Sequence, residues 1–155
     1  MVGFAVTFNL DEKDCLILSH LQQDARQSFA ALGRQVGMSV PAVTERVRRL
    51  EDRGIIQGYR VTIDEAKLGR GQTVFIQAKV PSPQYTQFIQ QCEQLDSVRE
   101  AHHVTGDYAF FIKAVVADML ELEGLIGQLS RFGATHSTLV MSTRYVADTV
   151  PVQSE

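Results

Sequence analysis

The arginine-rich stretch MSVPAVTERVRRLEDRGII, residues 38–56, is the part of the sequence whose residue types most clearly suggest a binding function. It holds four arginines, although the chain of 155 residues has a formal net charge of −3. The basic excess is local, because residues 1–60 have a charge balance of +1 and the rest of the chain −4. A phosphate backbone acts over a Debye length of about 8 to 10 Å, so local charge matters more than net charge. An acidic chain with one basic helix can therefore bind DNA.

Two interpretations of this stretch predict different side chains on its exposed face. A solvated helix interleaves acids and bases four residues apart, and Glu45 is placed to reach Arg48 or Arg49. The exposed first half instead carries small side chains and a hydroxyl, and the acids gather toward the end of the stretch. A small tip flanked by arginines suits a helix that enters the major groove end-first, where the tip meets bases and the flanks meet phosphates. We therefore favour DNA binding over a solvated charged surface.

The residues predicted to contact DNA lie at the start of the preceding helix and along the exposed side of the arginine-rich one. They are Ser28, Ser39, Val40, Pro41, Thr44, Glu45, Arg46, Arg48 and Arg49. Arg46 has two interpretations, because it lies at the edge of the buried stripe and can brace the fold as well as touch the DNA backbone.

The other reactive side chains show no signature of catalysis or metal binding. The histidines lack HxH or HxxxH spacing, and the adjacent pair His102 and His103 would point to opposite faces of a strand. The two cysteines, Cys15 and Cys92, fall on apolar helix stripes and are interpreted as core residues. No GxSxG or P-loop motif is present, so we expect a binding protein rather than an enzyme, with no cofactor and no metal.

The arginine-rich helix is the third of three short helices predicted near the N-terminus. Asp11 caps the first helix, Ser28 caps a second that ends at Gly37, and Ser39 caps the third. Helix, helix, glycine turn and helix together form the pattern of a helix-turn-helix. The β-branched run that follows, residues 55–63, predicts a short strand or wing.

The second half of the chain alternates strand and helix patterns after a polar, glycine-bearing boundary, DEAKLGRG. The predicted elements are a strand over 72–80, a helix over 85–95, strands over 97–104 and 108–116, a helix over 117–132 and a strand over 136–146. The last helix is expected to turn Met119, Leu122, Ile126 and Leu129 inward. This β-α-β-β-α-β order is that of a ferredoxin-like domain, in which two helices cover one face of a four-stranded antiparallel sheet. The expected fold class is α+β, with a DNA-binding domain over 1–63, a linker over 64–71 and a second domain over 72–155.

The other face of that sheet carries too many apolar side chains to be left in water. Phe75 and Phe111 are expected there in the company of Leu139, Met141 and Tyr145 or their neighbours. A partner subunit is the natural cover for such a face, so we expect a homodimer.

A close resemblance to the winged helix-turn-helix of the Lrp/AsnC (feast/famine) transcriptional regulators is carried by residues 10–69, LDEKDCLILSHLQQDARQSFAALGRQVGMSVPAVTERVRRLEDRGIIQGYRVTIDEAKLG. The effector-sensing domain of the same family is similar to residues 99–114, REAHHVTGDYAFFIKA. The resemblance implies a sequence-specific regulator that binds double-stranded DNA, dimerises through the sheets of its second domains and often assembles into octamers. It also implies an effector, an amino acid or related small metabolite, bound between dimers.

The resemblance favours the hairpin loop of residues 105–109 as part of the effector site. Its glycine lets a ligand approach the backbone, exposed N–H groups can hold a carboxylate, and Asp107 can receive an ammonium group. From the residues alone the loop is a plain Gly-Asp hairpin turn. The family commonly carries an acid where this chain has Ala109, so we expect weak amino-acid binding or a less cationic metabolite. The residues predicted to contact the effector are Thr105, Gly106, Asp107, Tyr108, Ala109, Thr138 and Met141.

The sequence also limits where the protein acts and leaves one alternative function. No apolar run is long enough to cross a membrane, and the first residues, MVGFAVTFNLDEKD, lack the pattern of a secretory signal, so we expect a cytoplasmic protein. The alternative to a transcription factor is an oligomeric small-molecule-binding protein or enzyme built on the second domain, with the first domain serving only assembly. DNA binding and its salt dependence distinguish the two.

Overall fold

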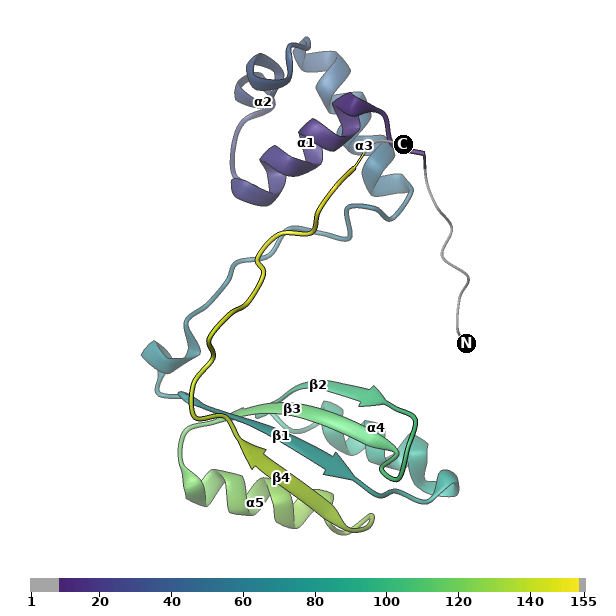
Figure 1. Ribbon diagram of the computed structural model, residues 1–155, viewed down its shortest axis with the longest axis vertical. Coiled ribbons are helices and arrows are strands. Elements are labelled where there is room, and N and C mark those ends of the chain that lie inside the picture. Colours follow the sequence, from purple (N-terminus) through teal and green to yellow (C-terminus); the bar gives the residue numbers. More distant parts are fainter. Residues whose placement is uncertain (1–8, 154–155) are drawn as a thin grey trace. The chain divides into compact units, whose positions relative to one another are not determined.

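The computed structural model describes residues 9–153, and the N-terminal residues in which no secretory signal is expected lie mostly outside this range. The chain divides into two compact units (Figure 1). Unit 1 comprises residues up to Val61 together with Tyr145 onward, and unit 2 comprises Thr62–Arg144. This division differs from the expected one, because the end of the chain joins unit 1 rather than the second domain. Within the described range no helix is long and apolar enough to cross a bilayer.

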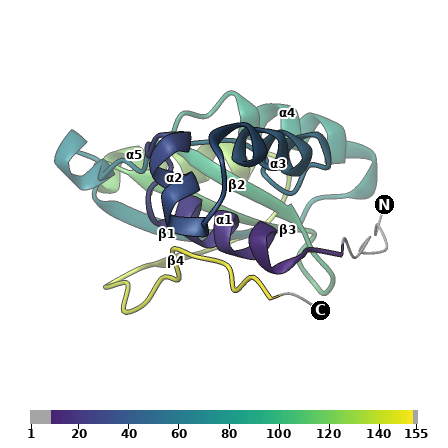
Figure 2. The same ribbon diagram turned by 90° about the horizontal axis from the view of Figure 1, so that it is seen from above.

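Unit 1 is built on three helices, α1 (Glu12–Gln23), α2 (Phe29–Val36) and α3 (Val40–Asp52), which lie together in Figure 2. The first two helices begin directly after their capping residues. Asp14 donates its backbone N–H to Asp11 Oδ1 at 2.8 Å, and Ala31 donates to Ser28 Oγ at 3.1 Å. Gly37 ends α2 in the left-handed conformation, which turns the chain into α3 within a few residues.

The core of unit 1 forms where the apolar stripes of the three helices meet. Its fully buried side chains are Ile17, Leu32, Val36, Val43, Val47 and Leu50. The buried residues of α3 repeat at helical spacing, so one side of α3 is buried in the core and the opposite side is exposed. This packing decides which α3 residues are available to a partner.

Arg46 lies between these two sides of α3 and fixes how the helix packs against α1. Its Nη1 atom lies 2.5 Å from Asp11 Oδ2 and 2.7 Å from Asp14 Oδ1. The Asp14 carboxylate is nearly buried, and a buried charge requires such a partner. The Arg46 side chain, 22% exposed, is thus engaged in bracing the fold.

The expected strand or wing over residues 55–63 is not formed as a strand in the described chain. Ile55 and Ile56 instead donate their backbone N–H groups to Leu50 O and close the end of α3. Both side chains pack partly buried against the unit 1 core. The residues beyond them are exposed and have no neighbouring strand in the described part of unit 1, and a strand needs a partner for its backbone groups.

Unit 2 holds β1 (Gln72–Ala78), α4 (Tyr85–Glu93), β2 (Val98–His103), β3 (Phe110–Val116), α5 (Met119–Leu129) and β4 (Thr135–Leu139), with short 3₁₀ turns η1 (Glu65–Leu68) and η2 (Ser82–Gln84). Its antiparallel sheet has the order β2-β3-β1-β4, which confirms the predicted ferredoxin-like topology (Figure 1). The last strand is shorter than predicted, since the chain leaves the sheet after Leu139.

One face of the sheet is buried beneath α4 and α5, and two of the expected positions need correction. Phe88, Ile76, Ile112 and Leu129 are the largest fully buried side chains of this core. Met119, expected to point inward, is exposed, because Leu122, Leu125 and Leu129 form the buried stripe of α5. Leu139 was expected on the opposite face, but it pairs with buried Val74 and so shares the helix-covered face.

The open face of the sheet has an aromatic centre with charges beside it. Phe75 and Phe111 lie on this face with their ring centroids 5.5 Å apart. Lys113 and His102 both contact Glu100, with Lys113 Nζ 3.1 Å and His102 Nε2 3.0 Å from carboxylate oxygens. Met141 and Tyr145, expected here, instead follow the strand and lie exposed.

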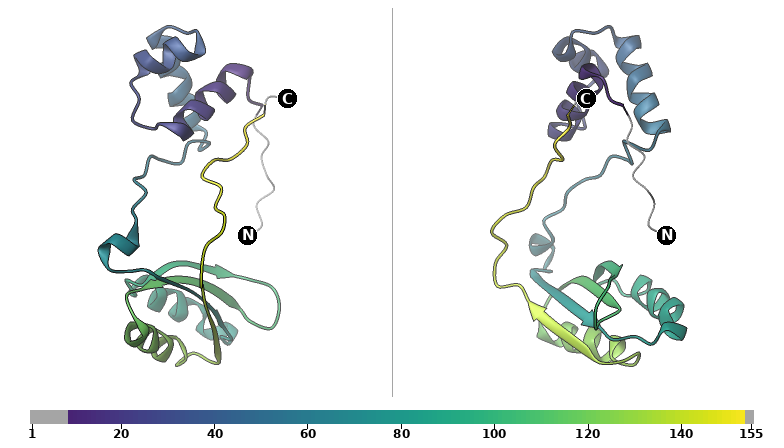
Figure 3. Two further views of the ribbon diagram at one scale, coloured as in Figure 1. Left: turned by 60° about the vertical axis from the view of Figure 1, so that its left-hand side comes forward. Right: turned by 45° about the vertical axis from the view of Figure 1, so that its right-hand side comes forward.

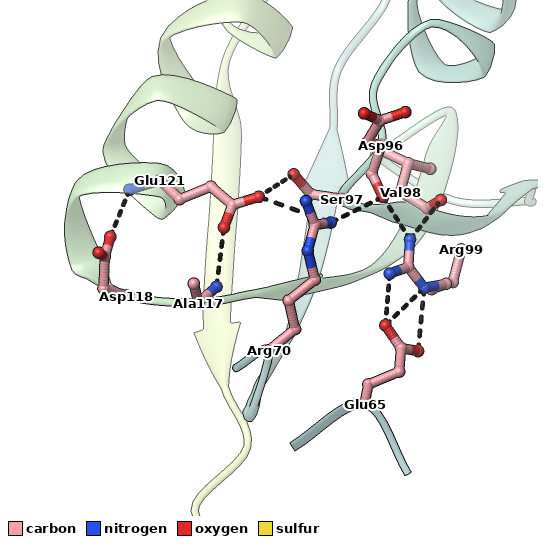
Figure 4. Close-up of polar contacts among 9 residues, drawn as sticks. All are labelled: Glu65, Arg70, Asp96, Ser97, Val98, Arg99, Ala117, Asp118 and Glu121. Atoms are coloured by element: carbon pink, nitrogen blue, oxygen red, sulfur yellow. Dashed lines mark hydrogen bonds and ion pairs between the residues drawn. The ribbon is translucent and has the colours of Figure 1, made fainter. Parts of the chain in front are cut away.

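The expected linker, residues 64–71, is attached to unit 2 by ion pairs (Figure 4). Arg99 contacts both carboxylate oxygens of Glu65, and this pairing holds the pKa of Glu65 below its ordinary value. Arg70 donates to the Asp96 carbonyl at 3.1 Å and approaches Glu121 at 3.8 Å. Glu121 also accepts from Ser97 Oγ and from the Ala117 N–H. These contacts make 64–71 a part of unit 2.

The ion pair between Asp11 and Arg46 predicts a pH-dependent stability of unit 1. Arg46, followed by the Asp14 N–H, holds the pKa of Asp11 below its ordinary value of 3.8. A carboxylate with a lowered folded-state pKa stabilises the fold above its unfolded pKa and loses that contribution as the pH falls through the folded value. Asp11→Asn keeps the cap and removes the charge, so it should cost up to about 1 kcal/mol at pH 7.

The cost of Asp11→Asn should shrink below about pH 3.8 and vanish in stronger acid, as measured by denaturant unfolding across pH. Glu12→Gln is the matched control, since it removes an exposed acid from the same helix turn. An equal loss in both variants at pH 7 would show that the helix dipole, and not Arg46, accounts for the effect.

Candidate nucleic-acid interface and effector cavity

The start of α3 presents the small side chains that were predicted at its tip. Val40 is 45% exposed, and Pro41 and Thr44 are exposed beside it. Thr44 donates its hydroxyl to the Val40 carbonyl at 2.9 Å, which orients the Oγ1 lone pairs outward as acceptors. Ser39 occupies the cap position without a side-chain capping bond, so its exposed hydroxyl is available to a partner.

The three arginines within α3 have different surroundings. Arg46 is paired with two acids of the α1 region. Arg48 is 64% exposed and lies 3.3 Å from Glu45 and 3.9 Å from Asp52, distances typical of weak surface pairs. Arg49 is exposed, and within residues 9–153 no ion pair involves it. The helix thus keeps one uncompensated cation and one weakly compensated cation on its open side.

Glu45 and Ser28 have local roles in the described structure. Glu45 accepts both contacts from Arg48, at 3.3 and 3.4 Å, so it positions that guanidinium. Ser28 caps α2 and its backbone and hydroxyl lie at the surface of unit 1. The predicted DNA-contacting residues other than Arg46 therefore all lie at the surface of unit 1, on α3 or at the start of α2 or α3.

The hairpin loop of residues 105–109 in unit 2 is closed by backbone hydrogen bonds. Val104 donates to the Ala109 carbonyl at 2.9 Å, and Ala109 donates to the Ala78 carbonyl at 3.0 Å. Gly106 has a φ of 113°, a conformation that side chains rarely adopt, and the space beside it is open. The loop is therefore anchored at its base with an accessible tip.

A cavity of about 410 Å³ lies beside this loop within unit 2. Three of the predicted effector residues, Gly106, Asp107 and Ala109, line it. Tyr108 flanks it, because Lys79 Nζ, from the cavity wall, lies 5.2 Å from the centre of the Tyr108 ring. Thr138 lies on the open sheet face opposite Phe75, and Met141 is 98% exposed beyond β4. Neither they nor Thr105 line this cavity.

Eight of the residues that line this cavity were not predicted from the sequence, and two of them, Lys79 and Gly133, shape it most clearly. Lys79 follows β1 and supplies a cation opposite in sign to Asp107 in the same cavity wall. Gly133 lies where an added Cβ would be 1.8 Å from the Lys79 carbonyl oxygen, so only glycine fits there. Both residues come from segments distant in sequence from the hairpin, so no local pattern connects them with it.

The described residues do not form a group of three or more histidine, cysteine or acidic side chains that could hold a metal ion. His103 packs against Tyr85 and Phe110, with ring centroids 4.9 and 5.3 Å away. Cys15 and Cys92 are buried, and burial raises the pKa of both thiols, to about 11 for Cys92. These residues belong to the packing of each unit.

Comparisons with known proteins give both units the same family. Residues 10–51 match the AsnC-type helix-turn-helix domain, and residues 73–150 match the Lrp/AsnC ligand binding domain. A transcriptional regulator of the helix-turn-helix type from Bacillus subtilis, YezC, is 36% identical over 135 residues, which cover 86% of this chain and 95% of that protein.

Solved structures agree with the sequence comparisons. The structure of Bacillus subtilis LrpC matches with a TM-score of 0.85 at 29% identity, covering 90% of this chain and 100% of that one. A feast or famine regulatory protein of Mycobacterium tuberculosis, complexed with L-methionine, matches with a TM-score of 0.79 at 29% identity, covering 88% of this chain and 95% of that one. The chain therefore belongs to the Lrp/AsnC family of helix-turn-helix transcriptional regulators.

Proposed function

We propose that the protein reads DNA with the exposed side of α3 and that an α-amino acid bound in unit 2 modulates this binding. The observation that carries the DNA-reading assignment is that the arginines of α3 differ in their surroundings. Arg46 is held by Asp11 and Asp14, while Arg48 and Arg49 flank a tip of small residues. Such a helix places its tip at base edges in the major groove and its flanking cations at phosphates.

The cavity beside the hairpin loop supports an amino acid as the effector. Lys79 and Asp107 give its wall one positive and one negative charge, complementary to a carboxylate and an ammonium group. The Mycobacterium tuberculosis relative is complexed with L-methionine, an amino acid of this class. In this chain Lys79 would receive the carboxylate and Asp107 the ammonium group, and the absence of an acid at Ala109 would limit the affinity.

We also propose that the protein forms a homodimer through the open face of the sheet. Phe75 and Phe111 form an aromatic pair at the centre of this face, and the charges of Glu100 and Lys113 beside them can pair again across an interface. A second copy is the partner that presents the same surface, as two-fold pairing requires. Assembly of four such dimers into an octamer is the extended form of the proposal.

Arg49→Ala should weaken DNA binding because it removes a cation that faces a phosphate. We expect lower affinity for every duplex and a slope of log affinity against log salt that is flatter by about one unit for each phosphate no longer neutralised. Arg131→Ala, which removes an exposed arginine of unit 2, is the control with the same charge change. Fluorescence anisotropy across salt concentrations measures both, and equal slopes in the two variants would contradict a phosphate contact at Arg49.

Asp107→Asn should remove the preference for an ammonium group. Calorimetry would compare L-methionine with its 2-oxo analogue, which keeps the carboxylate and side chain. We expect the wild type to bind the amino acid about tenfold or more tightly than the analogue, and Asp107→Asn to lose that difference. Lys79→Met should weaken both ligands. A preference that survives in Asp107→Asn would place the ammonium group elsewhere.

A further inference from the structure

The end of the chain returns to the DNA-binding unit after leaving the sheet at Leu139. There the side-chain amide of Gln22, on α1, forms two hydrogen bonds with the backbone of Val150. Gln22 Nε2 donates to the Val150 carbonyl at 3.1 Å, and the Val150 N–H donates to Gln22 Oε1 at 2.6 Å. The Gln22 side-chain amide thus pairs with both the backbone N–H and the backbone carbonyl of Val150, as a neighbouring strand would.

The apolar side chains next to this pair continue the contact. Val152 is half-buried against the hydrophobic core of unit 1, in the same cluster as Ile55 and Ile56. Figures 1 and 3 show the C-terminal segment reaching α1. The contact therefore combines paired hydrogen bonds at Val150 with the burial of an apolar side chain at Val152.

A groove of about 470 Å³ in unit 1 contains this contact. Its walls are mainly apolar, with Leu18 and Leu21 from α1 and Ile55 and Ile56 from the segment after α3. Residues 150–152 form one of its edges, and residues 57–60 form another. The C-terminal segment and the segment that follows the DNA-reading helix therefore share one apolar surface.

We propose that the C-terminal segment, residues 150–152, docked on unit 1 through Gln22 and the apolar core, orders residues 55–60 across the groove that both segments line, and that this order serves DNA binding. Residues 57–60 make no strand and are exposed, and the Tyr59 hydroxyl donates to Glu51 at 3.0 Å, so their remaining order depends on what packs beside them. Arg60 lies in this stretch and shares no ion pair within the described range, which leaves its charge available to a phosphate. An ordered segment loses less conformational entropy on binding than a free one.

The docked segment also lies at the end of a second chain connection between the two units. The chain passes from unit 1 to unit 2 near Val61 and returns near Tyr145. The return starts from β4, whose neighbour Val140 donates its N–H to the Thr73 carbonyl of β1. This inference rests on the proposed DNA-reading role of unit 1, and it adds a residue-level link between the end of the sheet domain and that unit.

Gln22→Ala tests the docking in the full-length chain, with Gln23→Ala as the matched control. Both replace an exposed glutamine near the end of α1 by the best helix former, so neither weakens the helix. Amide hydrogen exchange followed by NMR reports on Val150 and on residues 55–60. We expect Gln22→Ala to speed exchange at Val150 about tenfold or more, with a smaller increase over 55–60, and Gln23→Ala to change neither.

The effect of the docked segment on DNA binding is tested by measuring DNA affinity at fixed salt, using a duplex selected by the wild-type protein. Gln22→Ala should bind it about two- to tenfold more weakly than Gln23→Ala. A second variant, Val152→Asp, removes the apolar contact at the other point of docking and should act in the same direction.

Unchanged exchange at Val150 in Gln22→Ala would overturn the docking. Faster exchange at Val150 with unchanged DNA affinity in both variants would overturn the ordering of residues 55–60. Failure of the wild type to bind any duplex would instead contradict the proposed function, and the exchange measurement would still decide the docking.

Discussion

The pairing of Arg46 with Asp11 and Asp14 is the interaction on which the proposed DNA-binding surface depends. Helix α3 buries Val43, Val47 and Leu50 and must at the same time present its opposite side to a partner. Arg46 lies at the border between the two sides, and its contacts with Asp11 and Asp14 fix the rotation of α3 about its own axis. A helix free to rotate by a small angle would move its tip residues and its flanking arginines together.

The same one-sided burial organises unit 2. Helices α4 and α5 cover one face of the sheet, and the other face leaves Phe75 and Phe111, the centre of the proposed dimer interface, uncovered. The hairpin loop lies at the start of β3, anchored by Ala109 to Ala78, so it presents its tip on a rigid base. Each unit therefore carries its proposed binding surface on the side that its core leaves uncovered.

Much of this was predictable because the signals are local. Asp11 and Ser28 mark helix starts through short-range capping bonds, and the alternation along β1 marks a half-buried strand. The features that escaped prediction depend on long-range packing. Lys79 joins the cavity because β1 ends beside the hairpin, and Val150 meets Gln22 across 128 residues of sequence. No local pattern contains such pairings, and the strand expected at 55–63 did not form because the described part of unit 1 offers it no partner strand.

The central claim, that the tip of α3 reads base edges, is tested most directly by selection from a pool of randomised duplexes. Wild-type protein should recover a two-fold symmetric motif with half-sites about one helical turn, or a multiple of it, apart. Thr44→Val, which exchanges a hydroxyl for a methyl group of similar size, should change the preferred base at one position in each half-site. Recovery of the unchanged wild-type motif by Thr44→Val, together with variants of Val40 and Pro41 that also leave it unchanged, would contradict the account.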